Sequence, residues 1–241
     1  MLRYILTLTL LAFWCLSIGL AFAGTFTDDF SGNKLSDKWF VTKKRAVGDE
    51  IKVANGVLTF DAKGKDVVIG IRYGTIDLTK GEFILECDYI TGYQQTYISF
   101  NSDPSDTEAW DKQPMFIFIA VNGVYQFVGG GGPSVDAPFT YTVGQKDTHH
   151  YLVGFTPTND PKVYNYRTNI DKGKFEKSGK LNISTMNPAK TYVYFEIWTA
   201  SGNPTVLDNI VMTSPSIADG TSSVKPSEKL STAWGKIKNE K

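Results

Sequence analysis

The sequence predicts an all-β protein, a two-sheet antiparallel β-sandwich followed by a short flexible C-terminal tail. Short apolar or alternating segments recur along the chain and are separated by Gly, Pro, Asn and Asp residues, as in β-sandwiches. The main domain shows no convincing amphipathic helix pattern. Aromatic residues make up 13% of the chain beside 22 glycines, a composition that suits sheets with ring-bearing surfaces.

Residues 1–23 have the pattern of a secretory signal peptide. Arg3 precedes an apolar run over 4–20, and Ala21 and Ala23 supply the small residues before a cleavage site. The run is short and diluted for a membrane span, which disfavours an uncleaved anchor. We therefore expect a secreted protein, extracellular or periplasmic, with no membrane span after cleavage.

Charge and cysteine content exclude several classes of partner and linkage. Lys and Arg total 25, equal to the 25 Asp and Glu, so nothing suggests nucleic acid or an anionic membrane as partner. Cleavage after Ala23 would leave Cys87 without a second cysteine in the chain, and we interpret it as a small apolar core residue. The oligomeric state stays open.

Residues 24–213 are expected to form one domain. Asn55-Gly56 and Asn122-Gly123 favour type I′ turns and predict hairpins. The first hairpin joins strands expected at 51–53 and 57–60, and the second joins strands expected at 115–121 and 124–128. Further strands are expected at 26–30, 67–73, 76–78, 150–155, 162–168, 192–199 and 206–212.

The segment 81–100 is interpreted as two further strands joined by a glycine-containing turn, a hairpin. Its first strand alternates in character, which gives it an apolar and a polar face. The apolar face, expected against the core, comprises Phe83, Leu85, Cys87 and Tyr89, and the opposite face carries Glu86 and Asp88.

Residues 214–241 differ in composition and are expected to form a linker and a short amphipathic tail. Ser, Thr, Gly, Lys and Pro dominate its first part. Leu230, Trp234 and Ile237 then form one stripe of a short helix, which either packs on the sandwich or docks elsewhere.

Four segments carry a resemblance to a known superfamily. They are Phe26-x-Asp-Asp-Phe-Ser-Gly, Asn55-Gly-Val-Leu-Thr-Phe60, Gly81-Glu-Phe-Ile-Leu-Glu-Cys-Asp88 and Leu207-Asp-Asn-Ile-Val211. Over most of residues 24–213 the chain resembles the concanavalin A-like lectins and glucanases. It looks most like laminin-G-like jelly-roll domains of exported bacterial proteins, and more loosely like laminarinase-type glucanases. The resemblance implies a jelly-roll sandwich in which the first and last strands are neighbours and one concave sheet often carries a sugar site.

Glu86 and Asp88 match the first two acids of the laminarinase-type motif E-x-D-x-x-E or E-x-D-x-E. The third position falls on Ile90 or Thr91, neither of which can protonate a leaving group. We therefore assign no catalytic residue. If the protein is an enzyme, it is a glycoside hydrolase using Glu86 and Asp88 with an unidentified acid, for which Glu196 is a candidate. The plainer interpretation is a solvated polar face.

The segment 192–198 alternates between an apolar face and a face that suits a sugar. Aromatic rings can lie on the apolar face of a pyranose while a carboxylate accepts hydrogen bonds from hydroxyls. The alternative is that these rings cover the sheet or pack under loops. The candidate ligand-binding residues are Tyr194, Glu196, Trp198, Glu86 and Asp88, with Tyr97 and Trp110 as further members.

A structural calcium site is implied by the resemblance. Asp28 and Asp29 near the first strand and Asp208 near the last stand where ligands would, with backbone carbonyls and water completing the shell. The alternative is that these residues cap turns at strand ends.

The function expected from the sequence is an exported, carbohydrate-binding, lectin-like module without catalysis, whose partner is a polysaccharide or glycan. The alternatives are the glycoside hydrolase described above and an adhesion or structural domain that binds protein.

Overall fold

The computed structural model describes residues 23–44, 51–61, 67–90, 95–102, 115–121, 124–130, 133–136, 139–142, 148–171, 173–199 and 204–218. Within these ranges the chain forms sixteen strands and two 3-10 helices, η1 (Leu78–Lys80) and η2 (Pro188–Lys190). The predicted signal peptide up to residue 22 and the predicted tail from residue 219 lie outside the described ranges. Among the described residues, no helix has the length and apolar character needed to span a membrane.

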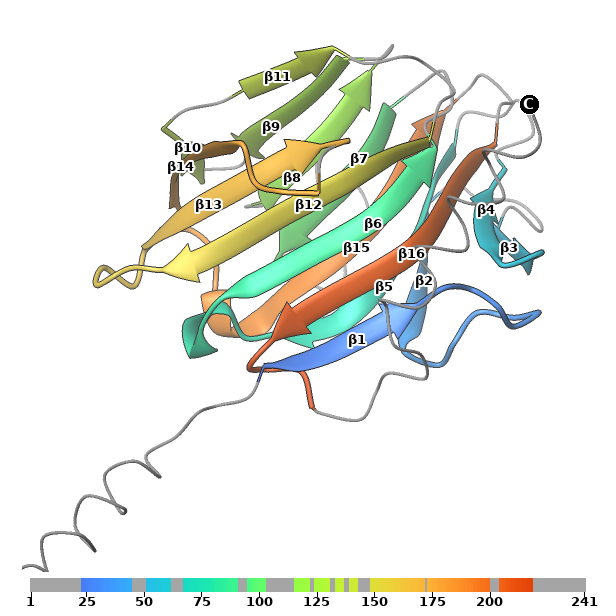
Figure 1. The fold of residues 1–241 in the computed structure, drawn as a ribbon, viewed down its shortest axis with the longest axis horizontal. Helices are drawn as coiled ribbons and strands as arrows, with labels where there is room; N and C mark the ends of the chain where they lie inside the picture. Colours follow the sequence, from blue (N-terminus) through green and yellow to red (C-terminus); the bar gives the residue numbers. More distant parts are fainter. Residues whose placement is uncertain are drawn as a thin grey trace, which may run out of the picture.

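Nine strands form one antiparallel sheet, which faces the viewer in Figure 1. From one edge to the other they are β10 (Ser134–Val135), β14 (Lys177–Asn182), β13 (Val163–Ile170), β12 (Thr148–Pro157), β6 (Phe83–Ile90), β16 (Thr205–Ser214), β4 (Val57–Phe60) and β3 (Ile51–Ala54), with β1 (Gly24–Asp28) also paired to β16.

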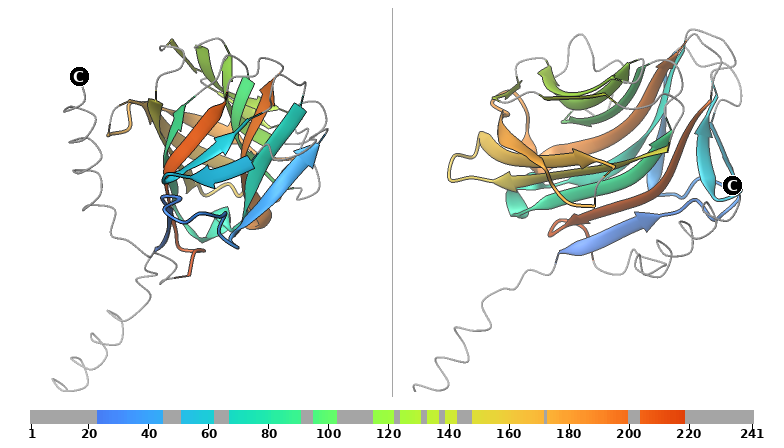
Figure 2. Two further views of the ribbon diagram at one scale, coloured as in Figure 1. Left: turned by 90° about the vertical axis from the view of Figure 1, so that its right-hand side faces the viewer. Right: turned by 45° about the horizontal axis from the view of Figure 1, so that its top comes forward.

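Seven strands form the second antiparallel sheet, which lies behind the first in Figure 1. In order across the sheet they are β11 (Phe139–Thr142), β9 (Val124–Gly130), β8 (Met115–Val121), β7 (Gln95–Asn101), β15 (Thr191–Thr199), β5 (Val67–Ile76) and β2 (Trp39–Lys44). The right-hand view of Figure 2 separates the layers, with β8, β9 and β15 above β12, β6 and β16. The all-β, two-sheet antiparallel sandwich predicted from the sequence is confirmed.

The core lies between the two sheets and is rich in aromatic rings. The apolar face predicted for β6 is buried in it, with Phe83, Leu85 and Cys87 fully covered. Trp39 of β2 joins the layers, because its indole ring meets the ring of Phe26 of β1 edge-to-face at 5.6 Å between centroids. Buried rings each remove large apolar areas from water, so this layer supplies most of the stabilisation.

The first and last strands are neighbours, as the resemblance implied. β1 pairs with β16 from Gly24 opposite Ser214 to Asp28 opposite Ile210. The β3–β4 hairpin is also confirmed, because Asn55 and Gly56 both have positive φ, 55° and 77°, as a type I′ turn requires. The second Asn-Gly turn, at 122–123, lies outside the described residues.

The hairpin predicted over 81–100 is wrong. β6 pairs with β12 and β16 in the nine-stranded sheet, whereas β7 pairs with β15 and β8 in the seven-stranded sheet. The chain therefore crosses from one layer to the other between these strands. This crossing determines which candidate residues share a surface.

Candidate functional site

The outer face of the seven-stranded sheet carries one part of the predicted sugar-binding set. On β15, Val193, Phe195 and Ile197 point into the core, so Tyr194 and Glu196 point to the opposite face, as the alternation predicted. Antiparallel pairing then brings side chains from β2, β5 and β7 onto the same face.

Two cross-strand rows organise this face. In the first, which we call the Glu196 row, Glu196 lies opposite Tyr97 of β7 on one side and opposite Gly70 of β5 on the other. Thr42 of β2 lies opposite Gly70 and ends the row. Residues directly opposite one another in an antiparallel pair have side chains close enough to act on one ligand.

The second row, the Arg72 row, runs parallel to the first. Tyr194 lies opposite Ser99 of β7 and opposite Arg72 of β5, and Phe40 of β2 lies opposite Arg72. The two rows bring together a carboxylate, a guanidinium, hydroxyls and aromatic rings within four adjacent strands.

Gly70 leaves room for the side chain of Glu196. A Cβ atom at position 70 would lie 2.6 Å from Cγ of Glu196 and 2.5 Å from the backbone oxygen of Phe195. Real Cβ atoms essentially never approach other atoms to less than 3.0 Å. The side chain of Glu196 therefore lies across β5 at the one position of the row without a side chain.

Much of the face is shielded from solvent. Tyr194 and Glu196 are only 1% and 3% exposed. Burial and the nearby charge of Glu196 raise the pKa of the Tyr97 phenol well above its ordinary value, so it stays a neutral hydroxyl. Oγ of Ser99 and Oγ1 of Thr42 are buried and make no hydrogen bond in the described structure. Buried hydroxyls without partners are uncommon in proteins and are candidates for ligand contacts.

Arg72 lies between two aromatic rings at the more open end of the face. The guanidinium carbon is 4.9 Å from the ring centroid of Phe40 and 4.7 Å from that of Tyr192. Both distances are within the range of cation–π attraction. Phe40 belongs to the edge strand β2 and is 52% exposed, so this end of the face is accessible to solvent.

Two predicted members of the site have no described side chain. The backbone of Trp198 continues β15, two residues beyond Glu196, and lies opposite Gln95 and Val68. The side chain of Trp198 lies outside the described part of the chain. Trp110 lies entirely outside it. Their sugar-binding role stays a prediction.

Glu86 and Asp88 do not share this face, so the prediction that they form one surface with Tyr194 and Glu196 is wrong. β6 belongs to the nine-stranded sheet, and its inward residues are Leu85 and Cys87. The two carboxylates consequently point away from the core on the opposite side of the molecule. The cause is the crossing of the chain between β6 and β7.

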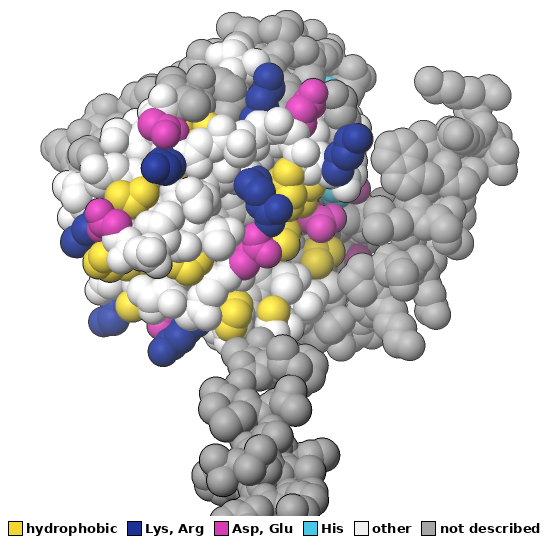
Figure 3. All heavy atoms as spheres, turned by 60° about the vertical axis from the view of Figure 1, so that its left-hand side comes forward, with side chains coloured by type: hydrophobic (Ala, Val, Ile, Leu, Met, Phe, Trp, Pro, Cys, Tyr) yellow, Lys and Arg dark blue, Asp and Glu magenta, His cyan; other side chains and the backbone are white. Residues whose placement is uncertain are grey.

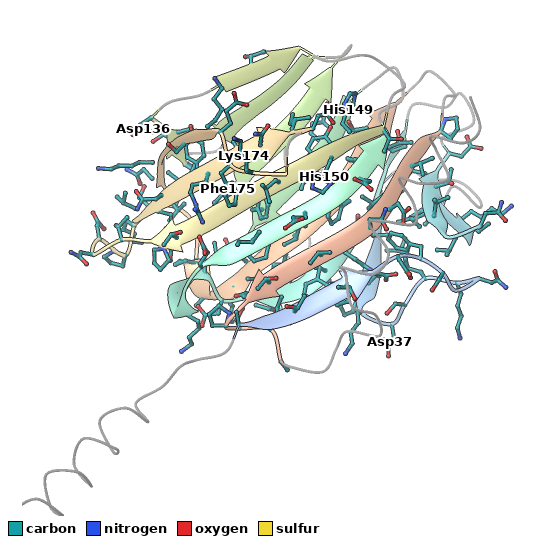
Figure 4. The ribbon with its side chains drawn as sticks, in the orientation of Figure 1. Asp37, Asp136, His149, His150, Lys174 and Phe175 are labelled. Atoms are coloured by element: carbon teal, nitrogen blue, oxygen red, sulfur yellow. The ribbon has the colours of Figure 1, made fainter. Side chains whose placement is uncertain are left out.

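On the nine-stranded sheet the two acids share one histidine. Nδ1 of His150 lies 2.9 Å from Oδ1 of Asp88, and its Nε2 lies 3.7 Å from Oε2 of Glu86. The hydrogen bond to Asp88 and the nearby carboxylate of Glu86 raise the pKa of His150 to about 9, against the opposing effect of burial. The amide of Asn209 donates a 2.8 Å hydrogen bond to Oδ2 of Asp88. At neutral pH His150 is therefore an imidazolium held between two carboxylates, which is a structural ion network. Figure 4 labels His150 and its neighbour His149.

The adjacent histidines of β12 point to opposite faces, as expected of strand neighbours. His149 is buried, and its Nδ1 lies 2.8 Å from Oδ2 of Asp171. Among the described residues, no group of three or more His, Cys, Asp or Glu side chains is placed to hold a metal ion.

The proposed calcium ligands are engaged in local hydrogen bonds. Asp28 accepts from Nε1 of Trp39 at 2.7 Å and from the backbone N–H of Phe30 at 2.9 Å, and Oδ1 of Asp208 accepts from the N–H of Asn209. Burial, together with the charges of Asp88 and Asp28, raises the pKa of Asp208 to about 6.

The third proposed ligand, Asp29, accepts a hydrogen bond from the N–H of Ser31. These contacts correspond to the turn-capping alternative. Asp28, Asp29 and Asp208 therefore do not fit a calcium site in this structure.

Sequence reasoning missed Arg72, Phe40, Ser99 and Thr42. Each lies on a strand segment whose partner strands are distant in the sequence, so their grouping depends on register. The one available signal was the alternation of Gly70, Ile71 and Arg72, which places a charged residue beside a glycine on the outward face of an otherwise apolar strand.

Comparisons with known proteins agree with the fold. No protein-family model matches the sequence, and no curated protein matches it. Among solved structures, the carbohydrate recognition domain of Emp47p is similar over 81% of this chain and 98% of its own, with a TM-score of 0.54 and 12% identity. The UEA-II lectin in complex with galactose is similar over 79% of this chain and 97% of its own, with a TM-score of 0.55 and 10% identity.

A third similar structure is SO2946, a protein of unknown function from Shewanella oneidensis MR-1. The similarity covers 89% of this chain and 95% of the chain of SO2946, with a TM-score of 0.54 and 14% identity. Identities this low show a common fold. The chain has the concanavalin A-like jelly-roll fold that the sequence resemblance implied.

Proposed function

We propose that this protein is an exported, lectin-like module that binds carbohydrate on the outer face of its seven-stranded sheet without catalysing a reaction on it. The observation that carries the proposal is the Glu196 row with its neighbours. A buried carboxylate lies beside Tyr97 and Tyr194, and the hydroxyls of Ser99 and Thr42 have no described partner.

This arrangement suits a sugar for physical reasons. Sugar hydroxyls donate to a carboxylate and exchange hydrogen bonds with neutral phenol and alcohol groups. The apolar C–H face of a pyranose lies well against an aromatic ring, and Phe40 offers a half-exposed ring at the edge of this face. The lectin neighbours support the proposal as proteins of the same fold, one described as a carbohydrate recognition domain and one bound to galactose.

The surroundings of Glu86 and Asp88 are the reason for proposing a module without catalysis. Glu86 and Asp88 are both bound to His150, and the next motif positions are Ile90 and Thr91. Glu196 lies on the other sheet and does not complete their motif. A retaining hydrolase needs a nucleophile and a proton donor on the two sides of one bond.

The test is a screen of the full chain against soluble and insoluble polysaccharides. Each mixture is scored for depletion of protein from solution and for release of reducing ends. We expect depletion by at least one polysaccharide without release. Release of reducing ends would show that the protein is a hydrolase and not only a binding module. If no polysaccharide depletes the protein from solution, the proposed sugar binding is wrong.

A further inference from the structure

Arg72 differs from the other described arginine in what it contacts. Arg167, on β13, stacks its guanidinium on Phe175 at 4.2 Å and also forms an ion pair with Glu82. Arg72 is stacked on two rings, Phe40 and Tyr192, and within the described ranges it has neither an ion pair nor a hydrogen bond. Its buried Nε–H in particular has no acceptor there.

From this contrast we propose that the sugar bound at this face carries an anionic group, a carboxylate or a sulfate, and that Arg72 binds that group. The inference rests on the proposed function and names the class of glycan that the site takes. The two rings hold the guanidinium between them. A guanidinium fixed in one orientation presents its donors as a fork that matches the paired oxygens of a carboxylate or sulfate.

The position of Arg72 beside Glu196 gives the two rows separate tasks. Arg72 lies opposite Tyr194, two residues along β15 from Glu196. The carboxylate of Glu196 repels an anion and accepts hydrogen bonds from sugar hydroxyls, whereas Arg72 attracts the anion. The ligand is therefore oriented, with its charged group toward Phe40 and the open edge and its hydroxyls toward the buried row.

Local rather than overall charge must drive this binding. Lys and Arg equal Asp and Glu over the whole chain, at 25 each. Figure 3 shows basic and acidic side chains interspersed on another side of the molecule, away from the outer face of the seven-stranded sheet. A chain without net charge does not attract a polyanion in general. Retention of an acidic polysaccharide would then point to a specific site.

The experiment is affinity electrophoresis of the full chain through gels containing acidic or neutral polysaccharides at about 0.15 M salt, where weak surface attraction is screened. Polygalacturonate supplies carboxylates and dextran sulfate supplies sulfates, with galactan and dextran as their neutral counterparts. The variants are Arg72→Gln, Arg72→Lys and, as matched control, Arg167→Gln, which makes the same change on the other sheet. Circular dichroism confirms that each variant is folded.

We expect the unmodified protein to be retarded by one acidic polysaccharide more than by its neutral counterpart, and the retarding one identifies the anionic group. Arg72→Gln should weaken that affinity at least about tenfold, since a charge-assisted forked contact is lost. Arg72→Lys should weaken it in part, because the charge stays and the fork is lost. Arg167→Gln should leave it unchanged.

Three results would overturn the inference. Equal losses in Arg72→Gln and Arg167→Gln would mean general charge attraction. Binding of a neutral polysaccharide that Arg72→Gln leaves intact would keep the proposed function and remove the anionic class. No binding of any polysaccharide by the unmodified protein would remove both. If Arg72→Gln does not fold, Arg72→Lys decides. The inference is then contradicted if Arg72→Lys binds the acidic polysaccharide as tightly as the unmodified protein does.

Discussion

Gly70 controls the geometry of the site at the scale of a single residue. Gly70→Ala would place a methyl group against Cγ of Glu196 and the backbone oxygen of Phe195. We expect a loss of about 1–3 kcal/mol in the free energy of unfolding, as for overpacked sites, and a loss of glycan binding. Gly74→Ala is the control on the same strand, because nothing lies within 4 Å of its Cβ position. Urea denaturation gives the free energy of unfolding of the two variants. Equal values for Gly70→Ala and Gly74→Ala would contradict this role of Gly70.

His150 makes stability depend on pH in the alkaline range. Its folded pKa of about 9 lies above the ordinary value of 6.5, so folding favours the protonated ring. The stabilisation is complete below about pH 6.5 and is lost as pH rises through about 9. His150→Gln should remove about 1–2 kcal/mol at pH 6, allowing for solvent screening of a partly exposed group.

The measurement is the free energy of unfolding of both proteins from pH 7 to pH 10. The difference between them should shrink as pH rises. Asp208 affects stability in a separate, lower pH range, because its pKa is raised from 3.8 to about 6. Folding favours the protonated carboxyl of Asp208, and this contribution to stability is lost as pH rises through about 6. A difference between His150→Gln and the unmodified protein that stays constant above pH 7 would contradict the assignment.

The role of Arg72 was beyond sequence reasoning because it is a relation between residues. Position 72 by itself is a charged residue in a strand. Its significance comes from Phe40 and Tyr194 opposite it and from Tyr192 stacked on it, which depend on pairing among three strands. Alternation within β15, by contrast, is local, and it correctly separated Tyr194 and Glu196 from the core residues.

At the scale of elements, the bulge in β16 fixes the ion network on the nine-stranded sheet. The register shifts between Asp208 and Val211, and Asn209 within it has φ of 50°. This left-handed conformation is tolerated by Asn and disfavoured for branched residues. The same Asn209 donates to Asp88, so the bulge couples the strand to the network.

Two substitutions separate these contributions of Asn209. Asn209→Gly keeps the conformation and loses the hydrogen bond, for an expected cost of about 1 kcal/mol. Asn209→Val loses both and should cost about 1–2 kcal/mol more. Chemical denaturation decides, and a valine variant as stable as the glycine variant would show that the bulge imposes no conformational requirement.

The sequence predicted strands better than it predicted their partners. The alternation of 83–90 gave the correct inward face of β6, since that pattern is a property of one strand. The hairpin prediction failed because nearness in sequence favoured pairing with β7, whereas β6 pairs with β12 and β16 across much longer separations. The error moved Glu86 and Asp88 to the wrong surface.

At the scale of the whole molecule, the packed core between two sheets is expected to stabilise the domain without calcium. Asp28, Asp29 and Asp208 hold backbone and indole N–H groups, and the described acids form no metal-binding group. Adding EDTA to protein in calcium-containing buffer should leave the melting temperature unchanged. A fall of several degrees on chelation, reversed by excess calcium, would require an ion that this account omits.

The location of the glycan is the central claim, and a paired titration tests it most directly. The polysaccharide that binds best is titrated calorimetrically into the unmodified protein, Glu196→Gln and Glu86→Gln, which make the same isosteric change on opposite sheets. We expect Glu196→Gln to weaken binding at least about tenfold, because a charged acceptor is lost, and Glu86→Gln to leave binding unchanged. Loss of binding in Glu86→Gln with Glu196→Gln unaffected would place the site on the nine-stranded sheet and contradict the account.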